Sequence, residues 1–123
     1  MAIISFSLTT REFLSGDKTV TRRAWKQGQT KRWQRFWDEG KLLHEAWDKV
    51  PFASGKKIGE FFLAMRPYTE KLRDMPELDL KAEGGMCASI EEFCELIGMG
   101  LDDEVTVIRF IPNIRKLIRR NAG

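Results

Sequence analysis

The chain has 123 residues, enough for one domain with one hydrophobic core and too few for two. A hydrophobic content of 42% and an aromatic content of 11% argue against intrinsic disorder, and the net charge is only +3. No apolar run approaches the roughly 20 residues that a membrane span needs, and the N-terminus shows no secretory signal. We therefore expect a cytoplasmic protein without membrane attachment.

Cysteine and histidine are scarce in this sequence. Cys87 and Cys94 fit neither a disulfide framework nor a paired zinc-ligand pattern. With His44 as the single histidine, a dedicated transition-metal site is not expected. We expect Cys94 to lie in the core, and we expect no metal or other cofactor.

The two signs of charge are separated along the chain. Seven basic residues and no acidic one lie between Lys18 and Arg35, whereas eleven carboxylates lie between Glu70 and Glu104. Such asymmetry indicates a surface that faces a polyanion. The alternative is an ordinary solvated surface on which the two signs mix in space.

The first predicted strand is Ile3–Leu8, in which Ile4, Phe6 and Leu8 share one face. A short helix over Thr10–Ser15 is expected to follow.

Thr9 and Glu12 have the spacing of a capping box at the start of this helix. Gly16 is expected to end it.

The next strand, Lys18–Arg23, is unusually polar. Only Val20 is plainly a core residue, and alternation places Lys18 and Thr21 on opposite faces unless the lysine lies at the turn before the strand. Arginine and hydroxyl side chains suit a bound phosphate or polar substrate. An edge strand protected by charge explains the same pattern, and the spacing does not decide between the two interpretations.

A loop is expected over Gln27–Thr30 and a helix over Lys31–Lys41. The aromatic residues of this helix recur at helical spacing, which is more typical of core packing than of a base-stacking surface. Its basic residues are the better candidates for phosphate contacts. They are Lys31, Arg32 and Arg35.

The remaining elements are predicted from local patterns. They are a short strand or turn at Leu42–Trp47, a central strand at Ile58–Met65, an irregular connection at Thr69–Leu80, a helix from the Ser89–Glu92 capping box to Gly98, and a strand at Val105–Phe110. The tail, Ile114–Arg120, is expected either to form a short basic helix or to fray.

Strands separated by single short helices, without regular βαβ alternation, indicate an α+β domain and are compatible with a small barrel. We expect one domain over residues 1–123, with its core at about 3–110 and a basic tail at 111–123.

Several motifs together resemble the ASCH domain family. They are Ser5-Phe6-Ser7, Gly16-Asp17-Lys18-Thr19-Val20-Thr21-Arg22-Arg23, Trp47-Asp48-Lys49 and Ala82-Glu83-Gly84-Gly85 followed by Ser89-Ile90-Glu91-Glu92-Phe93. The resemblance runs from about Ile3 to Phe110. It implies a PUA-like fold, which is a small, partly open β-barrel with short helices at its mouth and a cleft proposed to bind RNA. Some members of this family hydrolyse the acetyl amide of N4-acetylcytidine, others have been described as ribonucleases, and many have no assigned activity.

In the amidohydrolase branch, a lysine, a threonine three residues later and a downstream glutamate carry the chemistry. The matching positions here are Lys18, Thr21 and Glu83. Threonine needs a base to become a nucleophile, and a desolvated lysine beside arginines is suited to that role. Arg22 or Arg23 would then stabilise an oxyanion or hold a phosphate.

Two hypotheses follow. In the first, which the sequence favours, the protein binds RNA or a nucleotide through a basic cleft and surface, because phosphate contacts explain the surplus of cations around Thr21. The residues assigned to this role are Arg22, Arg23, Lys31, Arg32 and Arg35. In the second, it is a small hydrolase that uses Lys18, Thr21 and Glu83. The expected partner is RNA or a modified nucleoside, and the expected assembly is a monomer or weak dimer.

Overall fold

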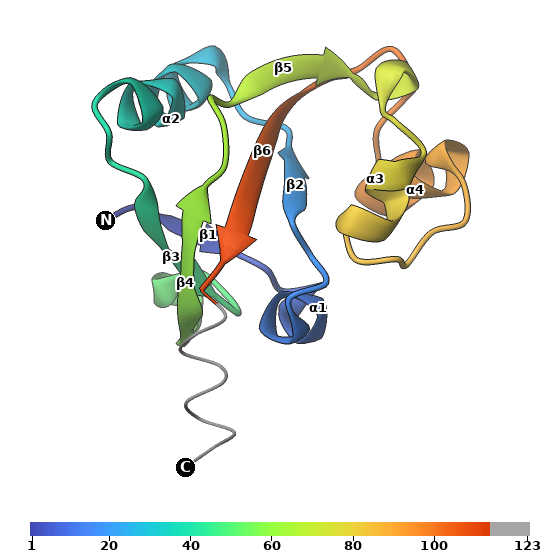
Figure 1. The fold of residues 1–123 in the computed structure, drawn as a ribbon. Coiled ribbons are helices and arrows are strands. Elements are labelled where there is room, and N and C mark those ends of the chain that lie inside the picture. Colours follow the sequence, from blue (N-terminus) through green and yellow to red (C-terminus); the bar gives the residue numbers. More distant parts are fainter. Residues whose placement is uncertain (114–123) are drawn as a thin grey trace.

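The computed structural model describes residues 1–113, which form a mixed α+β structure with one six-stranded sheet and short helices (Figure 1). The strands are β1 (Ile3–Ser5), β2 (Val20–Arg23), β3 (Leu43–Trp47), β4 (Lys57–Leu63), β5 (Tyr68–Lys71) and β6 (Glu104–Pro112). The α-helices are α1 (Thr10–Ser15), α2 (Gln27–Asp38), α3 (Leu78–Ala82) and α4 (Ile90–Ile97). Two 3₁₀ turns are η1 (Pro51–Ala53) and η2 (Leu72–Asp74). The α+β class predicted from the sequence is confirmed.

The long strand β6 organises the sheet, whose order is β1-β3-β4-β6-β2, with β5 also paired to β6. The first half of β6 pairs with β5 and its last residues pair with β4, while β2 runs antiparallel to its middle. Figure 1 shows β6 passing between β2 and β4. Among the strands of the described residues, only β1 and β3 pair in parallel. Strand β2, which carries the polar residues Thr21, Arg22 and Arg23, is therefore held against β6.

The two ends of the strand order, β1 and β2, do not pair within residues 1–113, so the sheet is not closed. A side chain links them instead. The Nη2 atom of Arg23 in β2 donates a hydrogen bond to the Ser5 carbonyl oxygen in β1 over 2.7 Å.

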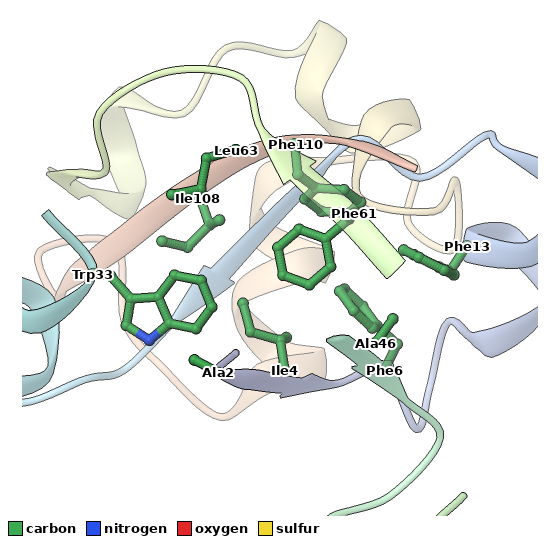
Figure 2. Close-up of a cluster of buried hydrophobic side chains, with 10 residues drawn as sticks. All are labelled: Ala2, Ile4, Phe6, Phe13, Trp33, Ala46, Phe61, Leu63, Ile108 and Phe110. Atoms are coloured by element: carbon green, nitrogen blue, oxygen red, sulfur yellow. The ribbon is translucent and has the colours of Figure 1, made fainter. Parts of the chain in front are cut away.

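Two clusters of apolar side chains form the core. The larger lies over β1, β3, β4 and the end of β6, and Figure 2 shows Phe61 near its centre with Trp33 and Phe13 on either side. The smaller joins β2 and β6 to α3 and α4. It includes Cys94, which is 5% exposed, so the predicted core position of this cysteine is confirmed. Val20 of β2 belongs to the smaller cluster, which anchors this strand.

The N-terminal predictions need two corrections. Strand β1 ends at Ser5, because the carbonyl oxygen of Phe6 closes a turn by accepting from Thr9 N and Thr10 Oγ1. Leu8, predicted to face the core, is 65% exposed.

The predicted Thr9–Glu12 capping box is also wrong, since Thr9 makes no side-chain cap. Gly16 ends α1 as predicted, with φ of 84°.

Helix α2 begins four residues earlier than predicted, at Gln27 rather than Lys31. The predicted loop at 27–30 is therefore wrong. The hydroxyl group of Thr30 is buried and hydrogen-bonded to that of Thr106 in β6, which draws this first turn onto the sheet. This tertiary contact outweighs the weak helix propensity of Gly28.

The segment 69–80 is not the irregular connection that we predicted. It contains most of β5, then η2 and the start of α3, and Pro76 precedes α3 rather than interrupting it. Leu43–Trp47 is a strand, and β4 lies between β3 and β6 as predicted for the central strand.

The helix predicted from Ser89 is confirmed, with Ser89 Oγ accepting from Glu92 N and Gly98 in the left-handed region. The strand predicted at Val105–Phe110 is also present and is longer at both ends. The predicted tail element, Ile114–Arg120, lies outside the described residues. Among residues 1–113, no helix combines the length and the apolar character needed to cross a membrane.

His44 is buried in the core, where its two ring nitrogens connect β3 to neighbouring backbone. Nδ1 accepts from Ala2 N over 3.2 Å, so Nε2 carries the proton and donates to the Lys41 carbonyl 2.8 Å away. The ring packs against Trp33 and Phe36. Burial lowers the pKa of His44 below 6.5, although the bond to Lys41 opposes this effect. The neutral ring is therefore the form that fits the fold.

We expect the free energy of unfolding to fall as the pH is lowered from about 7 to about 5.5. The unfolded chain protonates His44 at a higher pH than the folded chain does, so the stability present above pH 6.5 is lost as the pH falls through that value. Urea denaturation across this range measures the effect. His44→Phe keeps an aromatic ring that cannot titrate and serves as the control. Parallel pH curves for the wild type and His44→Phe would contradict this assignment.

Candidate functional site

Lys18 lies just before β2, between the ends of two helices. Its backbone N–H donates to the Glu12 carbonyl at the end of α1 over 3.1 Å, and the N–H of Thr19 donates to the Ala82 carbonyl at the end of α3 over 2.9 Å. Because Lys18 precedes the strand, strand alternation does not fix its direction, and it lines the same cleft as Thr21.

The cleft has a volume of about 160 Å³. Its polar lining comes from Lys18 and β2, from the turn after β1 and from Glu83. Its apolar lining comes from the same turn, from Met86 and from α4. The structure brings together five of the side chains predicted from the sequence, which are Lys18, Thr21, Arg22, Arg23 and Glu83.

Lys18 and Glu83 form a buried ion pair in the cleft wall. Lys18 Nζ lies 3.1 Å from Glu83 Oε1 and also donates to the backbone carbonyl of Glu83. The two side chains are only 3% and 7% exposed. Burial lowers the pKa of Lys18 below 10.5, and Glu83 offsets only part of that effect. Lys18 therefore gives up its proton more readily than an exposed lysine does.

Arg22 is enclosed by carboxylates and its side chain is 0% exposed. It donates to Glu83 Oε2 over 3.0 Å, to Glu70 Oε1 through two nitrogens, and to Asp79 Oδ2. Burial opposes the charge of Arg22, but these carboxylates outweigh it and raise its pKa. In this structure Arg22 orients Glu83 and has no guanidinium edge turned to solvent.

Asp79 connects this group to β6. Both of its oxygens accept from Arg109, over 3.0 and 2.7 Å, and Arg109 Nε also donates to Tyr68 Oη. Burial opposes ionisation of Asp79, but the bonds from Arg109 and Arg22 outweigh it and lower its pKa below 3.8.

Sequence reasoning did not identify Glu70, Asp79 or Arg109 as part of the site. The one available signal was the spacing of Asp79 and Glu83, which lie one helical turn apart, with Glu83 N bonded to Asp79 O over 2.8 Å.

Arg23 holds the hydroxyl group of Thr21. Its Nε donates to Thr21 Oγ1 over 3.0 Å, its Nη2 binds the Ser5 carbonyl, and its guanidinium lies 5.5 Å from the centre of the Phe6 ring. Burial lowers the pKa of Arg23, with partial compensation from Glu83. Because Thr21 Oγ1 accepts from Arg23, its own proton remains available to a base or a ligand.

The three basic residues predicted on α2 are exposed but do not line the cleft. Lys31 borders a polar groove of about 450 Å³ beside Trp25 and Thr69. Arg32 borders a third, apolar pocket, and its guanidinium lies 5.3 Å from the centre of the Phe36 ring. The structure therefore separates these three basic residues of α2 from the cleft that the polar residues of β2 line.

Comparisons with protein-family models, curated proteins and solved structures found no match to this chain. Within residues 1–113, no three His, Cys, Asp or Glu side chains are grouped to hold a metal ion. The chemistry of the site is therefore argued from its own geometry: a buried lysine–carboxylate pair and a threonine hydroxyl in one small cleft.

Glycine at position 84 holds the turn that follows Glu83 against α1. Gly84 has φ of +135°, and a Cβ atom there would lie 2.9 Å from Thr9 Cγ2. Gly85 has φ of +73°, and its Cβ would meet nothing within 4 Å. Only the first position combines a glycine-only conformation with close packing.

We expect Gly84→Asn to destabilise the fold by about 1–3 kcal/mol or more. The same substitution at Gly85 should change stability by less than about 0.5 kcal/mol, because asparagine tolerates the left-handed region. Chemical denaturation of the two variants gives the comparison. Equal losses at the two positions would show that the contact with Thr9 does not constrain this turn.

Proposed function

We propose that the protein is a small hydrolase that cleaves an amide bond of a modified nucleoside, with N4-acetylcytidine as the substrate implied by the ASCH resemblance. We also propose that its open six-stranded sheet is a PUA-like, partly open barrel with this cleft at its mouth. The observation that carries the proposal is the convergence of Lys18, Thr21 and Glu83 on one cleft. A volume of about 160 Å³ suits one small group better than a length of polymer.

The proposed reaction uses Thr21 as nucleophile. Its Oγ1 attacks the acyl carbonyl carbon while its proton passes to the neutral amine of Lys18, which then gives the proton to the departing amine nitrogen. Water hydrolyses the resulting ester, releasing the carboxylic acid and restoring the hydroxyl group. The lowered pKa of Lys18 supports this role, because only the neutral amine is a base.

The contacts of Arg22 and Arg23 support hydrolysis more than RNA recognition. Arg22 is bonded to three protein carboxylates, and Arg23 is bonded to Thr21 and to the Ser5 carbonyl. Binding of a phosphate by either arginine would require these bonds to be exchanged. The surplus of cations around Thr21 is thus balanced largely within the protein, and these contacts favour hydrolysis over RNA recognition at this cleft.

We expect Thr21→Ala, Lys18→Ala and Glu83→Gln each to lower kcat for N4-acetylcytidine by about 10²–10⁴-fold. Because the three groups act as a unit, the triple variant should be little worse than the worst single one. Thr19→Ala removes an exposed hydroxyl two residues away and should retain wild-type activity. Product release measured by absorbance, with circular dichroism as the check on folding, tests each variant.

Absence of turnover by the wild type with N4-acetylcytidine and with short RNAs would contradict the hydrolase proposal for those substrates. The assay with short RNAs is included because it detects a ribonuclease. A Thr21→Ala variant as active as the wild type would contradict the assigned nucleophile.

A second candidate function is RNA binding through α2. It is favoured by the exposure of Lys31, Arg32 and Arg35 on one helix. Such residues would neutralise phosphates without reading sequence.

If α2 binds RNA, Arg32→Gln with Arg35→Gln should weaken affinity for single-stranded RNA. The slope of log K against log salt should then flatten by up to about 0.7 for each phosphate that the variant no longer neutralises. Lys49→Gln, at an exposed turn outside α2, is the control for net charge. Fluorescence anisotropy at several salt concentrations measures both quantities, and an unchanged affinity and slope in the double variant would make α2 only a solvated face.

A further inference from the structure

A large apolar pocket lies away from the cleft and shares no lining residue with it. Its volume is about 710 Å³. The wall comes from the first two residues of the chain, from α2, from the loop between α2 and β3, from the start of β3 and from one residue of β4. Its apolar side chains include Ala2, Phe36, Leu42, Leu43 and Phe62. Phe62 is 41% exposed, so a large aromatic surface remains uncovered at this place.

The charged side chains at this pocket are all basic. Arg32 and Lys41 line it, and no carboxylate from residues 1–113 does. Lys41 lies 3.6 Å from Glu39, but the two side chains are 65% and 50% exposed, so this pair holds the lysine only weakly. Arg32 lies over Phe36, at the boundary between apolar wall and solvent. The pocket therefore combines an apolar interior with two cations.

The polar groups of the wall restrict the kind of ligand. His44 has both ring nitrogens bonded to backbone, at Ala2 and Lys41, and offers no hydrogen bond to a ligand. A nucleobase carries N–H donors as well as acceptors, and the free polar side-chain groups of this wall, in Arg32 and Lys41, are donors only. The N–H groups of a base would therefore lose their hydrogen bonds to water without replacement. A neutral hydrocarbon would offer no partner to the positive charges of Arg32 and Lys41. The remaining class is a molecule with an apolar body and one anionic end.

We propose that this pocket binds a free amphipathic carboxylate, with its apolar chain or ring against Phe36, Leu43 and Phe62 and its carboxylate at Arg32 and Lys41. Apolar burial supplies most of the affinity. The guanidinium of Arg32 supplies the preference for an anion, because charge-assisted hydrogen bonds to carboxylate are among the strongest in proteins.

Decanoate, kept below its micelle-forming concentration, is the probe. Titration calorimetry should detect binding to the full chain, and amide shifts in NMR spectra should change at Ala2, Leu43 and Phe62 but not at Thr21. Arg32→Gln should weaken decanoate binding by about tenfold or more. Arg35→Gln removes the same charge from the same helix without touching the pocket and should leave the affinity unchanged. Decanol should bind more weakly than decanoate.

Three results would overturn the proposal. The first is no decanoate binding at millimolar concentration. The second is an equal loss in Arg32→Gln and Arg35→Gln, which would indicate a general charge effect. The third is sedimentation with anionic lipid vesicles without binding of monomeric decanoate, which would make this face a membrane contact. Because the readout is binding and not turnover, the result is independent of the proposed hydrolase activity.

Discussion

The cleft depends on the carboxylate of Glu83, which lies between two buried cations. One oxygen accepts from Lys18 and the other from Arg22, and both partners are almost completely removed from solvent. Removing the carboxylate would leave Lys18 without a charged partner in a poorly solvated place, while Arg22 would keep Glu70 and Asp79. Loss of a buried partner is far more costly than loss of an exposed one. The same contact joins the segment before β2 to the end of α3. It therefore fixes the position of the lysine and holds the wall of the cleft together.

The ion pairs extend from Glu83 into the sheet. Three cations, Lys18, Arg22 and Arg109, face three carboxylates, Glu70, Asp79 and Glu83. Because of this balance, the charge asymmetry along the sequence does not become an equal asymmetry in space. A basic block and an acidic segment that are distant in the chain neutralise each other where β2, β5, α3 and β6 meet. The cations that remain exposed, among them Lys31, Arg32 and Arg35 of α2, lie elsewhere on the surface.

Local signals predicted the elements that local chemistry controls. Gly16 ends α1 and Ser89 caps α4, because a left-handed glycine and a side-chain cap act within a few residues. Predictions failed where distant contacts decide: the turn at Gln27 became helical through the bond from Thr30 to β6. In the site, Lys18, Thr21 and Glu83 were grouped through the ASCH resemblance, and the structure brings them together. Glu70 and Arg109 carry no local signal, because their partners come from other strands and helices, and Asp79 carries only its one-turn spacing from Glu83.

In the proposed reaction, burial makes Lys18 a base while Glu83 keeps it in position. Direct titration of the Lys18 side chain, by NMR spectroscopy of lysine labelled with ¹³C at Cε, tests this claim most directly. The account predicts a Lys18 pKa below 10.5, and a still lower one in Glu83→Gln, because Glu83 is the group that favours the charged form. A Lys18 pKa at or above 10.5, or one that rises in Glu83→Gln, would contradict it.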